Sequence, residues 1–261
     1  MSAIKITAVS YLNTKPLLYG LLKSDLAADI ELQLDIPSVC ARKLLSGQAD
    51  LGLVPVAVLP ELISPRIVSD YCIGADGTVR TVCIFSERPL EQVERLYLDF
   101  HSRTSVELTK ILLAEYWMLS PELVPAQEGY EALISGTTAG LVIGDRAIGL
   151  EQKFSYVYDL GEAWKNLTGL PFVFAAWVST RPLDPDFVAR FNDALHTGIQ
   201  DIPQLKYLLP SPHPNFSVED YFLHNISYHL DARKKQALSL FLEKMRARVE
   251  PSLRQSLEVS Y

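Results

Sequence analysis

The sequence predicts an α/β protein of two lobes that are joined by two crossing strands, which act as a hinge. Strand-like and helix-like segments alternate near the start of the chain, which is typical of a parallel sheet covered by helices. This alternation restarts after the apolar, β-branched stretch 79–85, and a second long apolar stretch covers 172–178. We therefore expect lobe 1 to comprise residues 1–84 and 176–261, and lobe 2 to comprise residues 85–175.

The first lobe is expected to open with a strand over 5–9 and a helix that runs from Pro16 to about Leu26. Asn13 or Thr14 can cap this helix, and proline is favoured in a first helical turn. The same lobe is expected to continue with a strand over 31–36, a helix over 37–47, a strand over 50–55 and a short helix over 56–62.

The second lobe is expected to begin with a strand over 95–99 and a long helix to Trp117, which the cluster 102–105 caps. Five shorter elements follow in chain order: a strand over 123–125, a helix over 128–135, a strand over 139–143, a helix over 145–151 and a strand over 156–160. From Asp184 onward the pattern is helical, and the last strong helix covers 232–249. A single doubly wound sheet with a helical tail is the alternative at this point.

Composition excludes several classes of protein. The 261 residues are 48% hydrophobic and 21% charged, as in an ordinary globular protein. The net charge of −7 and the lack of a basic run argue against a nucleic-acid partner. Cys40, Cys72 and Cys83 form no CxxC pair, which fits a reducing compartment. Because no signal sequence or long apolar stretch is evident, we expect a cytoplasmic protein without a membrane partner.

Cofactor and metal signatures are missing from the sequence. It contains no GxGxxG or GxxxxGK[ST] motif, and its five histidines include no HExxH pair. We therefore expect neither a nucleotide cofactor nor a metal site.

Two helix starts that directly follow strands are candidate anion sites. The first is the run from Ser10 to Thr14, and the second runs from Ser102 to Ser105. A helix N-terminus offers free N–H groups and a partial positive charge, and hydroxyl side chains add donors. Plain helix capping would explain either cluster alone, but two clusters on opposite lobes can grip a dianion between them. The turn 144–146 is either a third polar element of the cleft or an acidic helix cap.

Several segments, taken together, resemble chorismate dehydratases, which act in the futalosine route to menaquinone. Segment 9–17 reads VSYLNTKPL, and segment 141–147 reads LVIGDRA. The other segments that carry the resemblance are 47–56, 77–82, 102–105, 159–164 and 170–177. The resemblance implies a fold like that of type II periplasmic binding proteins, which agrees with the two-lobed layout. Thr81 stands where the family more often has serine, and it keeps the hydroxyl.

The resemblance also implies a reaction and a site. Chorismate would lose water to give 3-[(1-carboxyvinyl)oxy]benzoate in the cleft, without a cofactor or metal. The expected catalytic residues are Asn13, which would orient a substrate carboxylate, and Asp145, which competes with the substrate's own enolpyruvyl carboxylate for the role of base. The expected substrate-binding residues are Tyr11, Thr14, Ser38, Thr81, Ser102, Thr104, Ser105 and Gly144.

Two other functions stay open. A non-catalytic small-anion binding protein would share the fold, although such proteins are usually exported. The dihydroxynaphthoate-forming enzyme of the same route also shares it, but the YLNTKP start over 11–16 is not expected there. The oligomeric state does not follow from the sequence.

Overall fold

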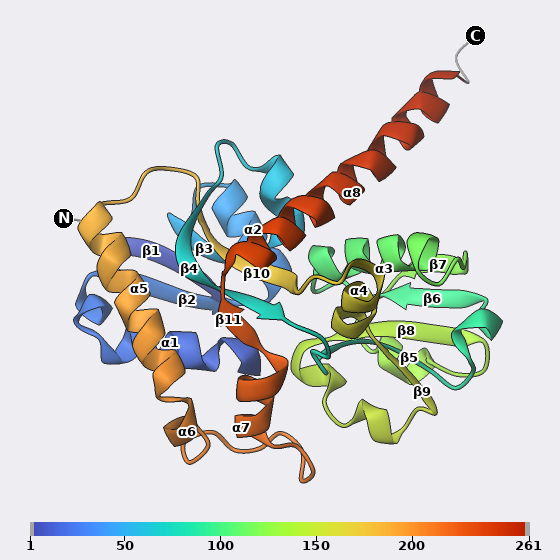
Figure 1. The fold of residues 1–261 in the computed structure, drawn as a ribbon, viewed down its shortest axis with the longest axis horizontal. Helices are drawn as coiled ribbons and strands as arrows, with labels where there is room; N and C mark the ends of the chain where they lie inside the picture. The colour runs from blue at the N-terminus through green and yellow to red at the C-terminus, as the bar shows by residue number, and fades with distance from the viewer. Residues whose placement is uncertain (1–2, 259–261) are drawn as a thin grey trace.

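The computed structural model describes residues 3–258, and they form two mixed β-sheets that lie side by side. Figure 1 shows the first sheet on the left and the second on the right, with helices packed around each. The predicted two-lobed α/β fold is therefore confirmed. Strands 5–9 and 95–98, which the alternative of one continuous sheet would join, lie in different sheets.

The first sheet has the strand order β11-β4-β10-β3-β1-β2. Its strands β1, β2 and β3 are parallel, whereas β10, β4 and β11 join them in antiparallel pairs. The bounds are β1 Ile4–Val9, β2 Ile30–Asp35, β3 Leu51–Pro55, β4 Arg66–Ala75, β10 Phe172–Ser179 and β11 Ser227–His229.

The second sheet has the strand order β7-β6-β8-β5-β9. Here β7, β6 and β8 are parallel, and β5 runs antiparallel to both β8 and β9. The bounds are β5 Val82–Ser86, β6 Arg95–Leu98, β7 Glu122–Pro125, β8 Thr138–Ile143 and β9 Tyr156–Asp159.

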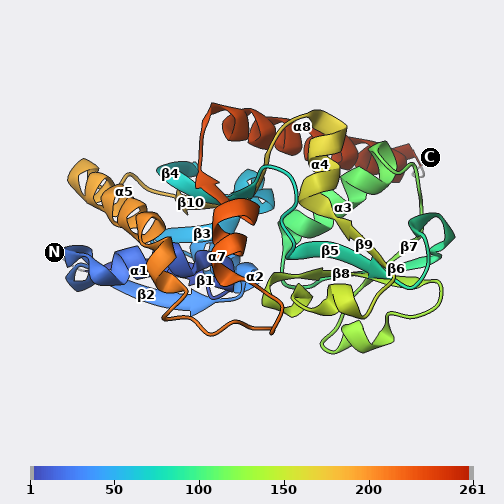
Figure 2. The same cartoon turned by 60° about the horizontal axis from the view of Figure 1, so that its bottom comes forward.

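The α-helices cover both sheets. Their bounds are α1 Lys15–Lys23, α2 Pro37–Leu45, α3 Arg103–Glu115, α4 Leu160–Thr168, α5 Pro185–Gln200, α6 Ile202–Leu205, α7 Val218–Asp220 and α8 Ala232–Glu258. Short 3-10 helices lie at Leu12–Thr14, Asp25–Ala28, Val56–Glu61, Leu90–Gln92, Tyr130–Leu133, Gly144–Ala147 and Leu150–Gln152, and a π-helix covers Tyr221–Asn225. Figure 2 shows α8 running above α3 and α4. Lys244 of α8 forms an ion pair with Glu115 of α3, so the last helix also holds the second lobe.

Some elements differ from the sequence expectation. The strands β4 and β11 and the helix α4 were not predicted, because Ser69 and Asp70 interrupt the apolar run of β4 and α4 follows β9 without an intervening loop. The expected helices over 128–135 and 145–151 are short 3-10 turns, because Gly129, Gly144 and Gly149 have positive φ angles that interrupt α-helix.

The chain changes sheets between Ala75 and Val82 and returns between Asp159 and Phe172. The buried Asp159 holds the two crossings together, because its carboxylate accepts the backbone N–H groups of Val79 and Arg80 and also caps α4. The division of the chain at residues 84 and 176 stays a prediction. Among residues 3–258, no helix combines the length and apolar character that a membrane crossing requires.

Candidate active site

A cavity with ≈ 490 Å³ of empty space, open solvent at its mouth included, lies where the two sheets meet. Residues of both lobes and of the crossing segments line it, namely Val9, Tyr11, Asn13, Thr14, Pro37, Pro55, Ile73, Val79, Thr81, Val82, Ser102, Ser105, Ile143, Gly144, Phe174 and Ala175. Seven of the ten predicted site residues are in this lining, and Ser38, Thr104 and Asp145 are not.

The segment after β1 forms the wall from the first lobe. Asn13 and Thr14 belong to a 3-10 turn, and neither side chain caps α1. The Thr14 hydroxyl donates to Asn13 Oδ1 at 3.2 Å, while Tyr228 of β11 donates to the Asn13 carbonyl at 2.9 Å. Asn13 is therefore held by its backbone, and its side-chain oxygen, the group that would cap a helix, accepts the Thr14 hydroxyl instead.

The start of α3 forms the wall from the second lobe. Ser102 caps this helix, as predicted, because its Oγ accepts the Ser105 N–H at 3.3 Å. The Ser105 hydroxyl also donates to Ser102 Oγ, at 3.2 Å. A serine hydroxyl has two acceptor positions and one proton. Since both acceptor positions of Ser102 are used, its own O–H is left to donate toward an anion at the helix N-terminus.

Thr104 and Ser38 join the lobes rather than line the cavity. The buried Thr104 hydroxyl accepts the Ala57 N–H at 3.1 Å, and Ala57 belongs to the first lobe. The Ser38 N–H donates to the His101 carbonyl of the second lobe at 3.1 Å, and the neighbouring Pro37 takes the place in the lining. The sequence pattern placed both residues near the cleft but did not distinguish a contact between lobes from a contact with a ligand.

Asp145 also bridges the lobes. Its carboxylate oxygens lie 2.9 and 3.1 Å from the Leu12 nitrogen, whose N–H they accept. Burial raises the pKa of Asp145, whereas the hydrogen bond from Leu12 and the charge of Lys15 act in the opposite direction. The carboxylate is partly buried where it meets Leu12, although the residue as a whole is exposed to solvent. The neighbouring Gly144 lines the cavity at a φ of +67°, and a Cβ there would lie 2.7 Å from the Tyr11 ring.

The crossing segment contributes Thr81. This residue is buried, and its Oγ1 lies 2.7 Å from the hydroxyl of Tyr221, which comes from the π-helix 140 residues later in the chain. Complete burial raises the pKa of the Tyr221 hydroxyl. The sequence does not point to Tyr221, since nothing in the local pattern distinguishes it from a core tyrosine.

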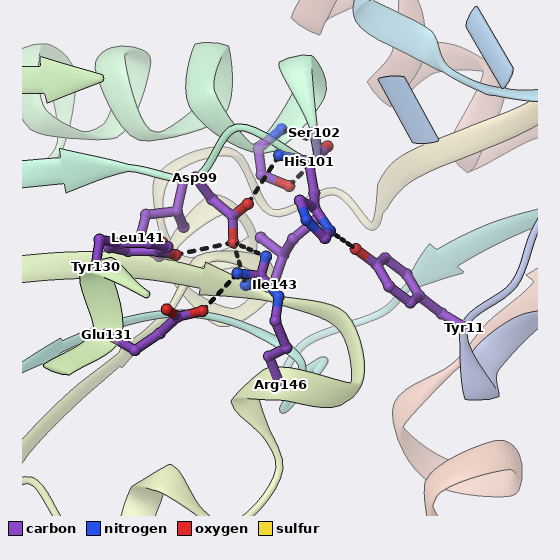
Figure 3. A network of polar contacts seen from close by, with 10 residues as sticks. Tyr11, Asp99, His101, Ser102, Tyr130, Glu131, Leu141, Ile143 and Arg146 are labelled. Carbon is purple, nitrogen blue, oxygen red and sulfur yellow. Dashed lines mark hydrogen bonds and ion pairs between the residues drawn. The ribbon is translucent and has the colours of Figure 1, made fainter. Parts of the chain in front are cut away.

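A buried polar network supports the wall from the second lobe (Figure 3). Asp99 lies at its centre, and its carboxylate accepts the N–H groups of His101 and Ile143 at 2.8 and 3.0 Å. It also accepts hydrogen bonds from the Tyr130 hydroxyl at 2.9 Å and from the Arg146 guanidinium at 2.5 Å. One carboxylate thus ties the loop before α3 to the loop after β8, and both loops line the cavity. This network was also missed, because a lone Asp at the end of a strand carries no signal.

The cavity lining is electrically neutral. Among the described residues that line it there is no Lys, Arg, His, Asp or Glu, and the polar groups are hydroxyls, one amide and backbone. A bound carboxylate would therefore be held by hydrogen bonds and by the partial positive charge at the start of α3. Within residues 3–258 no group of three or more His, Cys, Asp or Glu side chains is arranged to hold a metal ion.

Comparison with known proteins identifies the chain's relatives. Residues 4–247 match the sequence model of the family described as "Menaquinone biosynthesis". The chain is 30% identical over 231 residues to a chorismate dehydratase of Thermus thermophilus, a match that covers 80% of this chain and 84% of that protein.

Solved structures of distant sequence share the fold. A protein from Archaeoglobus fulgidus superposes with a TM-score of 0.71 at 14% identity and covers 94% of this chain and 97% of its own. The aliphatic sulphonate binding protein SsuA of Escherichia coli has a TM-score of 0.57 at 14% identity, with 97% of this chain and 94% of its own covered. The predicted periplasmic-binding-protein-like fold is therefore confirmed, and the chain belongs to the menaquinone-biosynthesis family.

Proposed function

We propose that this protein dehydrates chorismate to 3-[(1-carboxyvinyl)oxy]benzoate in the cavity between its lobes, as a step of the futalosine route to menaquinone. The observation that carries the proposal is the similarity to a chorismate dehydratase over 80% of the chain. That match agrees with a cavity between the lobes whose neutral donors come from both of them. Chorismate has two carboxylates, and the cavity has two walls with donors for them.

The reaction balances without a cofactor. The ring carbon that bears the ether loses a proton, the neighbouring carbon loses its hydroxyl group, and the two leave together as one water molecule. The ring becomes aromatic, which supplies the driving force. The protein's task is then mainly to hold the dianion in one orientation and to exclude bulk water.

Each wall has a role in this proposal. The Ser102 hydroxyl, with the start of α3, binds one carboxylate, and Ser105 orients that hydroxyl by donating to its oxygen. The amide NH2 of Asn13 donates to the second carboxylate of chorismate and fixes that carboxylate against the substrate ring. Thr14 and Thr81 lie beside Asn13 in the cavity lining. Asn13 is a poor base, so the substrate's enolpyruvyl carboxylate takes the ring proton and then gives it to the departing hydroxyl group, which leaves as water.

Asp145 is the alternative base within the protein. Its engagement with the Leu12 N–H and its place outside the cavity lining favour the substrate carboxylate instead. In this proposal Asp145 serves the reaction by anchoring the loop that carries Asn13.

The test is to incubate the purified protein with chorismate alone and to follow the loss of its absorbance, with the product identified by NMR. We expect turnover without nicotinamide, flavin or ATP, and the same rate after dialysis against EDTA. Loss of activity with EDTA that a divalent ion restores would contradict the proposal.

A second candidate is a non-catalytic anion-binding protein, which the fold shared with binding proteins such as SsuA favours. Calorimetry separates the two: this candidate predicts that chorismate binds and is recovered unchanged. Formation of dihydroxynaphthoate from its own precursor would instead identify the sister enzyme of the route.

A further inference from the structure

Tyr11 and His101 meet across the junction of the two lobes. The Tyr11 hydroxyl lies 2.5 Å from His101 Nδ1, although the two residues are 90 positions apart in the chain. Their rings are nearly parallel, with an angle of 6° between the planes. Figure 3 shows the two side chains pointing at one another from opposite sides. The pair joins the two lobes, since Tyr11 follows β1 and His101 precedes α3.

His101 is held in place from several directions. Its backbone N–H donates to the fully buried carboxylate of Asp99 at 2.8 Å, and its carbonyl accepts the Ser38 N–H at 3.1 Å. The Phe100 ring stands edge-on to the imidazole, with the ring centres 4.5 Å apart. The imidazole therefore has little freedom to follow Tyr11 and instead determines where the Tyr11 hydroxyl lies.

The position of Tyr11 shapes the cavity. Its ring lies against Gly144, where it fills the space that a side chain would occupy, and both residues line the cavity. A tyrosine ring that turned away would remove this part of the wall and open the cleft to water. His101 itself is outside the cavity lining.

We propose that His101 is a positioning residue that, through its hydrogen bond with Tyr11, holds the lobes closed and keeps the Tyr11 ring in the cavity wall. This inference rests on the proposed function, because the cavity it completes is the one assigned to chorismate. Burial and the nearby charge of Arg146 lower the pKa of His101. This favours the neutral imidazole, whose Nδ1 can accept the hydrogen bond from the Tyr11 hydroxyl.

The test is a double-mutant cycle with a rescue variant. Tyr11→Phe and His101→Leu each remove the hydrogen bond, so each should raise KM for chorismate about two- to tenfold with a smaller change in kcat. The double variant should be no worse than the more affected single variant, because both remove one interaction. His101→Asn retains a polar atom near the Nδ1 position and should restore most of the affinity.

The protein offers a matched control. Tyr71 and His196 form the same kind of pair at 3.0 Å, but both belong to the first lobe and lie outside the cavity lining. His196→Leu should leave KM and kcat unchanged. Additive losses in the cycle, a wild-type KM for His101→Leu, or an equal effect of His196→Leu would overturn the inference.

Small-angle X-ray scattering separates this inference from the proposed function. If the wild-type protein does not turn over chorismate, the proposed function fails, and the scattering then decides about the pair. A larger radius of gyration for His101→Leu than for wild type and His101→Asn would support the closing role. If the wild-type protein does not turn over chorismate and all three proteins scatter identically, the closing role of His101 is rejected.

Discussion

Replacement of Ser102 is the sharpest test of the anion site at the start of α3. Ser102 has two functions in the structure: its Oγ caps the helix by accepting the Ser105 N–H, and its own proton is left to donate into the cavity. The cap contributes about 1 kcal/mol to stability when serine is compared with alanine, but only a few tenths when it is compared with glycine. A charge-assisted hydrogen bond to a carboxylate contributes about 1.5–3 kcal/mol to binding.

These magnitudes predict different results for two substitutions at one position. Ser102→Ala and Ser102→Gly should both raise KM for chorismate by about 10- to 150-fold, because both lose the donor. Only Ser102→Ala should lower the free energy of unfolding by about 1 kcal/mol. Steady-state kinetics gives KM, and urea unfolding gives the stability.

Thr104→Ala is the matched control from the same helix turn. Its hydroxyl accepts the buried Ala57 N–H and is outside the cavity lining. Its loss should therefore cost about 1–3 kcal/mol of stability and leave KM nearly unchanged. Two results would refute the anion site at α3. One is a KM that rises in proportion to the loss of unfolding free energy across Ser102→Ala, Ser102→Gly and Thr104→Ala, and the other is a wild-type KM for Ser102→Gly.

Two further substitutions address the proposed chemistry. Asn13→Ala should lose turnover more than affinity. Asn13→Asp should bind chorismate more weakly, because it places a negative charge beside a dianion. An Asn13→Asp variant with undiminished kcat would refute the orienting role and indicate a protein base at this position. Asp145→Asn weakens the bridge to Leu12 and should raise KM about two- to tenfold with nearly normal kcat, since an amide oxygen still accepts the N–H. A fall in kcat of about 100-fold or more at constant KM would identify Asp145 as the base instead.

The fold class and the two walls of the cavity follow from the sequence pattern. The alternation of strands and helices predicts parallel sheets, and side chains that follow such strands gather at the edge where the carboxyl ends of the strands meet. That rule is local, so it placed Asn13, Thr14, Ser102 and Ser105 at the cavity before any tertiary contact was known. The family resemblance added Thr81 on the crossing segment, which also lies there.

Which polar residues face the cavity and which face the other lobe depends on tertiary contacts. Thr104 and Asp145 lie next to lining residues in sequence, yet their oxygens accept N–H groups of Ala57 and Leu12. The partners of these contacts are 47 and 133 residues away in the chain, so no local pattern reveals them. The same holds for the pair of Tyr11 with His101. A hydrogen bond between lobes depends on how two separately formed surfaces meet, and a sequence pattern describes only one surface at a time.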